Sequence, residues 1–143
     1  MIGMVLATHG ELGRALIGSM EMIVGAQPLV AALSLQVADG LEDATGRLQE
    51  ALDRVDEGDG VLVLTDMLGG TPSNLCLALI GGSRQVEVVS GVNLPMVLKA
   101  AHVRRESSLG DTAAQVKKVG RGAILVASEV LAGPESAAPG SRP

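Results

Sequence analysis

Two stretches of the chain end an apolar run at a single ionisable residue, and these residue types suit phosphoryl chemistry. In IGMVLATHG the run stops at His9, and in GVLVLTDMLGGTP it stops at Asp66. A neutral imidazole has one N–H and one nitrogen with a free lone pair. A carboxylate that accepts the N–H sets the tautomer and leaves the other nitrogen as an outward-facing nucleophile. We therefore predict that His9 is the nucleophile and that Asp66 orients its ring.

The segment after Asp66 has the composition of an oxyanion cradle. Thr71 followed by Pro72 is typical of a helix N-cap and first helical residue, and the two glycines before them let the backbone approach an anion. Phosphoryl transfer mainly requires such positioning and charge stabilisation. We therefore predict four phosphate-binding residues: Gly69, Gly70, Thr71 and Ser73.

The elements that must position these residues follow an alternating pattern. Near-continuous apolar runs predict strands at residues 2–7, 29–36, 61–65, 86–90 and 123–127. Apolar positions at helical spacing, with capping residues, predict helices at residues 12–20, 41–55, 72–80, 95–103 and 111–120, the last capped by Asp111. Strands that alternate with helices indicate an α/β, doubly wound, mainly parallel sheet with helices on both faces.

A sheet order of 2-1-3-4 would bring the chemistry together. Ligands of open α/β sheets bind beyond the carboxyl ends of the strands, where the strand order reverses. In this order the first and third strands are neighbours, so His9 and Asp66 become adjacent. Each feature by itself has an ordinary structural explanation, as a surface histidine, a turn or a helix cap. Their predicted convergence at one crevice is what favours a functional site.

Composition excludes several classes of function. The 143 residues carry a net charge of −5 and include no Phe, Tyr or Trp, which argues against nucleic-acid binding and against sugar or base stacking. The usual nucleotide-loop, hydrolase and metal-ligand motifs are missing from the sequence, so we expect neither a cofactor nor a metal. We expect Cys76 to be a buried thiol. With no basic leader and no long apolar run, the chain is expected to be cytoplasmic.

Local rules make further predictions about side chains. In LKAAHVRRES, we expect His102, Arg104 and Arg105 to form a solvated basic helix end. Asp39 and Glu42 have the spacing of a capping box at the start of the second helix. Residues 1–130 are expected to form one domain, and the Pro/Gly/Ser-rich residues 131–143 a disordered tail.

Three blocks of sequence resemble the IIA component of the mannose-family, phosphoenolpyruvate-dependent sugar phosphotransferase system. They are ATHGELG, TDMLGGTPSN and SGVNLPMVL, in this order, and the similarity covers about residues 1–130. The resemblance implies that His9 is the phosphorylated histidine, that Asp66 holds its ring and that Gly70 and Thr71 belong to the phosphate-facing turn. Leu68 departs from the pattern, because family members often carry an aromatic residue there.

The resemblance also implies partners. His9 would accept phosphate from the histidine-containing phosphocarrier protein and pass it to a histidine of a separate IIB component, in a system that reaches the membrane only through IIC and IID. It implies a homodimer, in which some family members pair the last strand antiparallel across subunits; here that edge strand would be residues 123–127.

Alternatives remain at this point. The same chemistry at His9 could serve a regulatory protein whose phosphorylation state is sensed by a partner without sugar transport. The phosphotransfer subunit of dihydroxyacetone kinase has a similar start but fits Asp66 to Asn74 less well. A small anion-binding domain without transfer is a third interpretation. The sequence does not identify the sugar.

Overall fold

Four parallel strands form one sheet in the order β2-β1-β3-β4. The computed structural model describes residues 1–36, 38–67 and 71–133, with only the backbone for residues 71–73. The strands are β1 (Gly3–His9), β2 (Val30–Leu35), β3 (Val61–Thr65) and β4 (Val86–Ser90). The α/β fold class and the 2-1-3-4 order predicted from the sequence are therefore confirmed.

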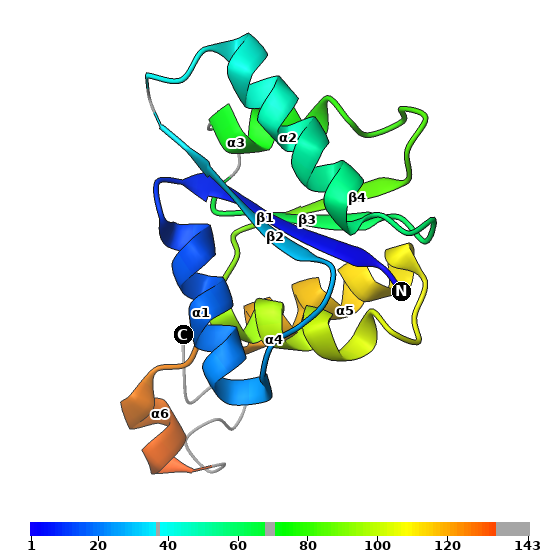
Figure 1. Cartoon of the computed structure of the whole chain (residues 1–143). Helices are drawn as coiled ribbons and strands as arrows, with labels where there is room; N and C mark the ends of the chain where they lie inside the picture. The colour runs from blue at the N-terminus through cyan, green and yellow to red at the C-terminus, as the bar shows by residue number, and fades with distance from the viewer. Residues whose placement is uncertain (37, 68–70, 134–143) are drawn as a thin grey trace.

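Helices cover both faces of this sheet (Figure 1). α2 and α3 lie on one face, and α1, α4 and α5 lie on the other. The helices are α1 (Leu12–Val24), α2 (Leu41–Val55), α3 (Thr71–Leu77), α4 (Leu94–Val103), α5 (Leu109–Gly122) and α6 (Ala127–Ala132).

The two inner strands explain the unbroken apolar runs of the sequence. Alternate residues of β1 and β3 enter two separate cores, one under α2 and one under α1, α4 and α5. For example, Val5 and Val63 pack toward α2, whereas Leu6 and Leu64 pack toward α4. Since both faces of β1 and β3 are covered, neither strand needs a polar face, and their carboxyl ends are held rigidly side by side.

The predicted fifth strand at residues 123–127 is wrong for the single chain. α5 continues to Gly122, residues 124–126 are irregular, and α6 starts at Ala127. A strand requires a neighbour for its backbone N–H and C=O groups, and none pairs with this segment in the described part of one chain. α6 also reaches into the predicted tail at residue 131; residues 134–143 lie outside the described part.

Several helix ends differ from the sequence prediction. The N-cap of α2 is Gly40, because the Asp39 carboxylate accepts the N–H of Gln36 instead, at 2.8 Å. α5 begins before Asp111, because the Ser108 side chain accepts the Asp111 N–H at 3.1 Å. α3 stops at Leu77, short of residue 80, because the following backbone tightens into i→i+3 turns.

Arg104 is buried, contrary to the expectation of a solvated basic end. Its side chain is 1% exposed, and its guanidinium donates to the carbonyl oxygens of Ile2 and Leu29 at 3.1 and 3.2 Å and of Pro28 at 2.5 Å. Those carbonyls lie at the amino ends of β1 and β2, and that of Leu29 also accepts the backbone N–H of Met4 at 2.9 Å. His102 and Arg105 are exposed, as predicted.

Candidate functional site

His9 and Asp66 meet at the carboxyl end of the sheet. His9 is the last residue of β1, and Asp66 directly follows β3, which pairs with β1 in parallel. The ring Nδ1 of His9 lies 2.9 Å from Oδ2 of Asp66, and the backbone N–H of His9 donates to the same oxygen at 3.0 Å. The structure therefore brings together the two residues on which the sequence prediction depends, although they are 57 positions apart.

The contact determines which ring nitrogen is available. A carboxylate only accepts hydrogen bonds, so Nδ1 carries the proton and the lone pair of neutral His9 is on Nε2. The His9 side chain is 43% exposed, whereas that of Asp66 is 14% exposed. The partly buried Asp66 carboxylate thus restrains the ring through Nδ1, while the rest of the imidazole is partly exposed to solvent.

Asp66 is held as a carboxylate. Burial acts to raise its pKa, but hydrogen bonds from the backbone and ring of His9 outweigh burial, so the pKa lies below its usual value of 3.8. The other carboxylate oxygen accepts the backbone N–H of Met67 at 3.0 Å. Asp66 is therefore charged at neutral pH and restrained by three donors.

The turn after His9 is supported from β2. Gly10 has a left-handed backbone with φ of +51°, a conformation that glycine adopts without strain. Its N–H donates to the Leu35 carbonyl at 2.9 Å, and its carbonyl accepts the hydroxyl of Ser34. Sequence reasoning missed Ser34; the signal was a lone hydroxyl near the end of the apolar run LVAALSL.

The start of α1 is fastened directly to the strand that carries His9. The buried hydroxyl of Thr8 accepts the backbone N–H of Gly13 at 2.8 Å, which satisfies one free donor of the first helical turn. A Cβ at Gly13 would lie 3.0 Å from the Leu6 carbonyl oxygen, so helix and strand are in close contact here. The residues on both sides of His9 are thus part of rigid structure.

The predicted phosphate cradle is only partly visible. Gly69 and Gly70 lie outside the described residues. Thr71 and Ser73 lie in the first turn of α3, as the sequence predicts, but their side chains are outside the described part. α3 packs against β1, β3 and β4.

Other candidate chemistry is limited in the described part of the chain. Cys76 is buried, as predicted, and burial raises the pKa of its thiol to about 12, so it is an unreactive core residue. Within residues 1–36, 38–67 and 71–133, no three His, Cys, Asp or Glu side chains are grouped so as to hold a metal ion. None of the helices described is long and apolar enough to cross a membrane.

Comparison with known proteins identifies the family. Residues 3–117 match the family model described as "PTS system fructose IIA component". The chain is 30% identical to the fructose-specific EIIA component of Bacillus subtilis, over 92% of this chain and 90% of that protein. It is 27% identical to the mannose-specific EIIAB component of Escherichia coli over 99% of this chain, and it spans 46% of the length of that protein.

A solved structure agrees with the sequence matches. Phosphotransferase system component EIIA from Streptococcus agalactiae superposes with a TM-score of 0.82 at 29% identity, over 90% of this chain and 99% of that one. The sequence similarity, the sheet order and the fold all point to the same group of proteins. The chain therefore belongs to the mannose-family IIA components of the sugar phosphotransferase system.

Proposed function

We propose that this chain is a phosphoryl carrier in which Nε2 of His9 takes a phosphoryl group from a histidine-containing phosphocarrier protein and gives it to a histidine of a IIB component. The observation that carries the proposal is the 2.9 Å contact between Nδ1 of His9 and Asp66, because it leaves the exposed ring with one free lone pair.

Each transfer exchanges one P–N bond for another. The lone pair of His9 Nε2 attacks phosphorus, and the bond between phosphorus and the donor's ring nitrogen breaks, with its electron pair returning to that nitrogen. The phosphorylated ring of His9 keeps its proton on Nδ1 and becomes more cationic, so its hydrogen bond to the Asp66 carboxylate strengthens. Asp66 thereby stabilises the carrier state, and the reverse sequence delivers the group to the acceptor.

Further parts of the proposal rest on the sequence and the family. We propose Gly69, Gly70, Thr71 and Ser73 as contacts for the phosphoryl oxygens, with no resident cofactor. The position of α3, whose first turn includes Thr71 and Ser73 and which packs against β1, supports this assignment. The exchange requires the chain to share a compartment with its donor, which we propose is the cytoplasm, as part of a sugar-uptake system.

Labelling tests the function directly. Incubation with phosphoenolpyruvate and the general phosphotransferase proteins should give an acid-labile, alkali-stable phosphate on the wild-type protein and none on His9→Ala. His102→Ala is the matched control, because it removes the exposed second histidine and should label normally. Equal labelling of His9→Ala, or no labelling of the wild type, would exclude the proposed carrier role of His9.

We also propose that two copies of the chain pair through the β4 edge. β4 is an outer strand, and a groove of about 580 Å³ runs between it and α5, lined by residues that include Val88, Met96 and Ala113. The neighbouring segment exposes Ile124, Leu125 and Val126 by 79%, 70% and 56%. Addition of this segment from a second copy to the open edge would cover both apolar surfaces.

Mass measurement distinguishes this pairing from a monomer. The wild type should have twice the chain mass by light scattering, and Leu125→Asp should have the mass of one chain. Met22→Asp changes a side chain of similar exposure on α1 and should remain a dimer. A wild-type monomer at working concentration, or a Leu125→Asp dimer, would contradict the proposed interface.

A further inference from the structure

We propose that Ser34 is a positioning residue for His9, and that Arg47 acts through it by holding the end of β2. This inference rests on the proposed role of His9 as phosphoryl acceptor. Neither residue belongs to the three sequence blocks that carry the family resemblance. The proposal is built from the hydrogen bonds that join the turn after His9 to β2 and then to α2.

The first link joins β2 to the turn after His9. In the parallel register Thr8 lies beside Ser34 and His9 beside Leu35. Both backbone groups of Gly10 bond to this strand end: its N–H donates to the Leu35 carbonyl at 2.9 Å, and its carbonyl accepts the Ser34 hydroxyl. Glycine has no side chain that restricts its backbone, so these two bonds set the direction in which the chain leaves His9.

The second link is the pair of hydrogen bonds that His9 makes with Asp66, at the end of β3. One carboxylate oxygen of Asp66 accepts both the backbone N–H and the ring Nδ1 of His9. Any movement of the His9 backbone therefore displaces the ring relative to its support. Hydrogen bonds from β2 restrain the chain after His9, and Asp66 restrains the backbone N–H of His9 itself. The imidazole therefore keeps a single orientation only while both sets of hydrogen bonds are intact.

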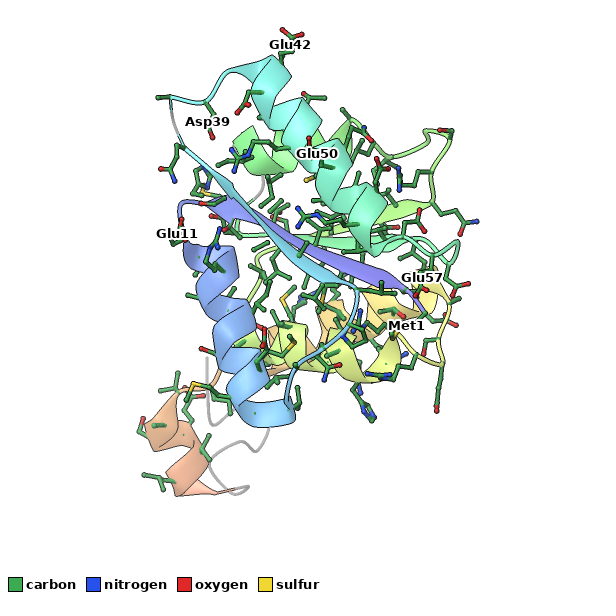
Figure 2. The ribbon with its side chains drawn as sticks, in the orientation of Figure 1. Met1, Glu11, Asp39, Glu42, Glu50 and Glu57 are labelled. Carbon is green, nitrogen blue, oxygen red and sulfur yellow. The ribbon has the colours of Figure 1, made fainter. Side chains whose placement is uncertain are left out.

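The third link fixes the end of β2 itself. The carbonyls of Leu29 and Leu35 point toward β1, so the carbonyl of Ser34, of opposite parity, points to the open edge of the sheet. Arg47 of α2 donates to that carbonyl at 2.7 Å and pairs with Asp39 at 3.2 Å. Figure 2 shows Asp39 and Glu11 near this end of the sheet, away from Met1 and Glu57.

The Ser34 hydroxyl has a second possible acceptor besides the Gly10 carbonyl, and the test must distinguish the two. Its hydroxyl oxygen lies 3.1 Å from Oε1 of Glu11, whose other oxygen pairs with Arg14 at 3.0 Å. A hydroxyl has one proton and cannot donate to both acceptors at once. If Ser34 acts through Gly10, as we propose, Glu11→Gln should not reproduce the effect of Ser34→Ala.

Transfer kinetics give the first readout. Ser34→Ala should lower the rate of phosphoryl transfer at saturating donor by about three- to tenfold, the effect of one misplaced hydrogen bond. The donor concentration for half-saturation should not change. Ser34→Thr keeps the hydroxyl and should restore the rate. Thr45→Ala is the matched control, because it removes a hydroxyl that bonds a carbonyl within α2 at 2.7 Å and should transfer normally.

Nitrogen NMR of the His9 ring gives a readout that does not require transfer. In the wild type, Ser34→Thr and Thr45→Ala, the spectrum should show one tautomer with its proton on Nδ1. Ser34→Ala and Arg47→Met should show a mixture of tautomers in a protein that is still folded. If phosphoenolpyruvate does not label the wild type but the Ser34→Ala and Arg47→Met spectra differ from it as stated, the carrier function is excluded and the positioning role of Ser34 stands. If Ser34→Ala retains both the rate and the single tautomer, Ser34 is not a positioning residue.

Discussion

His9 and Arg104 are nitrogen-rich side chains at opposite ends of the sheet, and their bonding differs in kind. At the carboxyl end His9 is 43% exposed and bonded to a carboxylate through one ring nitrogen. At the amino end Arg104 is 1% exposed and donates to three backbone carbonyls, with no carboxylate bonded to it in the described part of the chain. Burial, together with the charge of Arg105, lowers the pKa of Arg104 to about 10.

The difference in burial and bonding indicates a structural role for the Arg104 guanidinium and leaves the His9 imidazole available for chemistry. Arg104 donates from its two terminal nitrogens to the ends of β1 and β2, and its Nε has no partner in the described part of the chain. Since Arg104 is 1% exposed, a substrate in solution does not reach these nitrogens. His9 has the reverse arrangement, because its backbone and one nitrogen are bonded while the second nitrogen is left over. A polar side chain at an end of the sheet is thus a better functional candidate when it is exposed and one of its nitrogens or oxygens has no partner.

The largest expected effect is on stability at the amino end. Arg104→Ala leaves the carbonyls of Ile2 and Pro28 without this donor and removes one of the two donors to the carbonyl of Leu29, so it should reduce the free energy of unfolding by about 3–5 kcal/mol. Urea denaturation measures the change. Arg105→Ala, which removes an exposed side chain, should cost less than about 0.5 kcal/mol. Similar values for the two variants would mean that the buried hydrogen bonds contribute little.

At the carboxyl end the large effect should be on rate instead. Asp66→Asn keeps the size of the side chain but removes the charge that we propose stabilises the phosphorylated ring, so phosphoryl transfer should slow by about 10- to 100-fold. Circular dichroism should show an unchanged fold. Rapid-quench labelling measures the transfer rate, and a wild-type rate in Asp66→Asn would remove the proposed role of Asp66.

A smaller effect is expected at Thr8, which is buried next to His9. Thr8→Val keeps the shape but leaves the N–H of Gly13 without its acceptor, and should cost about 1 kcal/mol of unfolding free energy. Thr112→Val is the control, because the buried Thr112 hydroxyl has no hydrogen-bond partner among the residues that the structure describes, and its removal should leave stability unchanged or higher. The comparison requires Thr8→Val to be the less stable of the two.

The smallest effect is the pH dependence of the His9–Asp66 contact. Because the folded pKa of Asp66 is lower than its usual value of 3.8, the folded protein binds fewer protons there than the unfolded chain. Its contribution to stability is therefore complete above about pH 4 and is lost as the pH falls through the lower folded pKa. The difference in melting temperature between wild type and Asp66→Asn should shrink below this pH; a constant difference would mean that the carboxylate charge is not involved.

Sequence reasoning succeeded where one residue pattern has one structural solution. The apolar runs that end at His9 and Asp66 require strands buried on both faces, and these are the inner strands β1 and β3. The motif blocks gave the family, which the comparisons confirm. Local rules were less reliable at helix ends, since the carboxylate of Asp39 bonds Gln36 and Arg47 rather than capping α2.

The failures share one cause, which is competition from distant residues. Arg104 resembles a solvated helix end in sequence, but its guanidinium meets carbonyls 75 to 102 positions away. Residues 123–127 have the composition of a strand, but a strand forms only beside another strand, and no strand in the described part of one chain pairs with this segment. Neither outcome can be deduced from the residues next to it.

By itself, the sequence determined that this chain has a parallel α/β sheet, with a histidine at the end of one inner strand and a carboxylate at the end of the other, because apolar periodicity and residue chemistry are local properties. Tertiary structure decided the rest. The pairing of β1 with β3 set the 2.9 Å contact and selected Nε2 as the free nitrogen. The pairing of β1 with β2 brought Ser34 to the turn after His9. Hydrogen bonds act over about 3 Å, so only the folded chain determines which distant groups come close enough to form them.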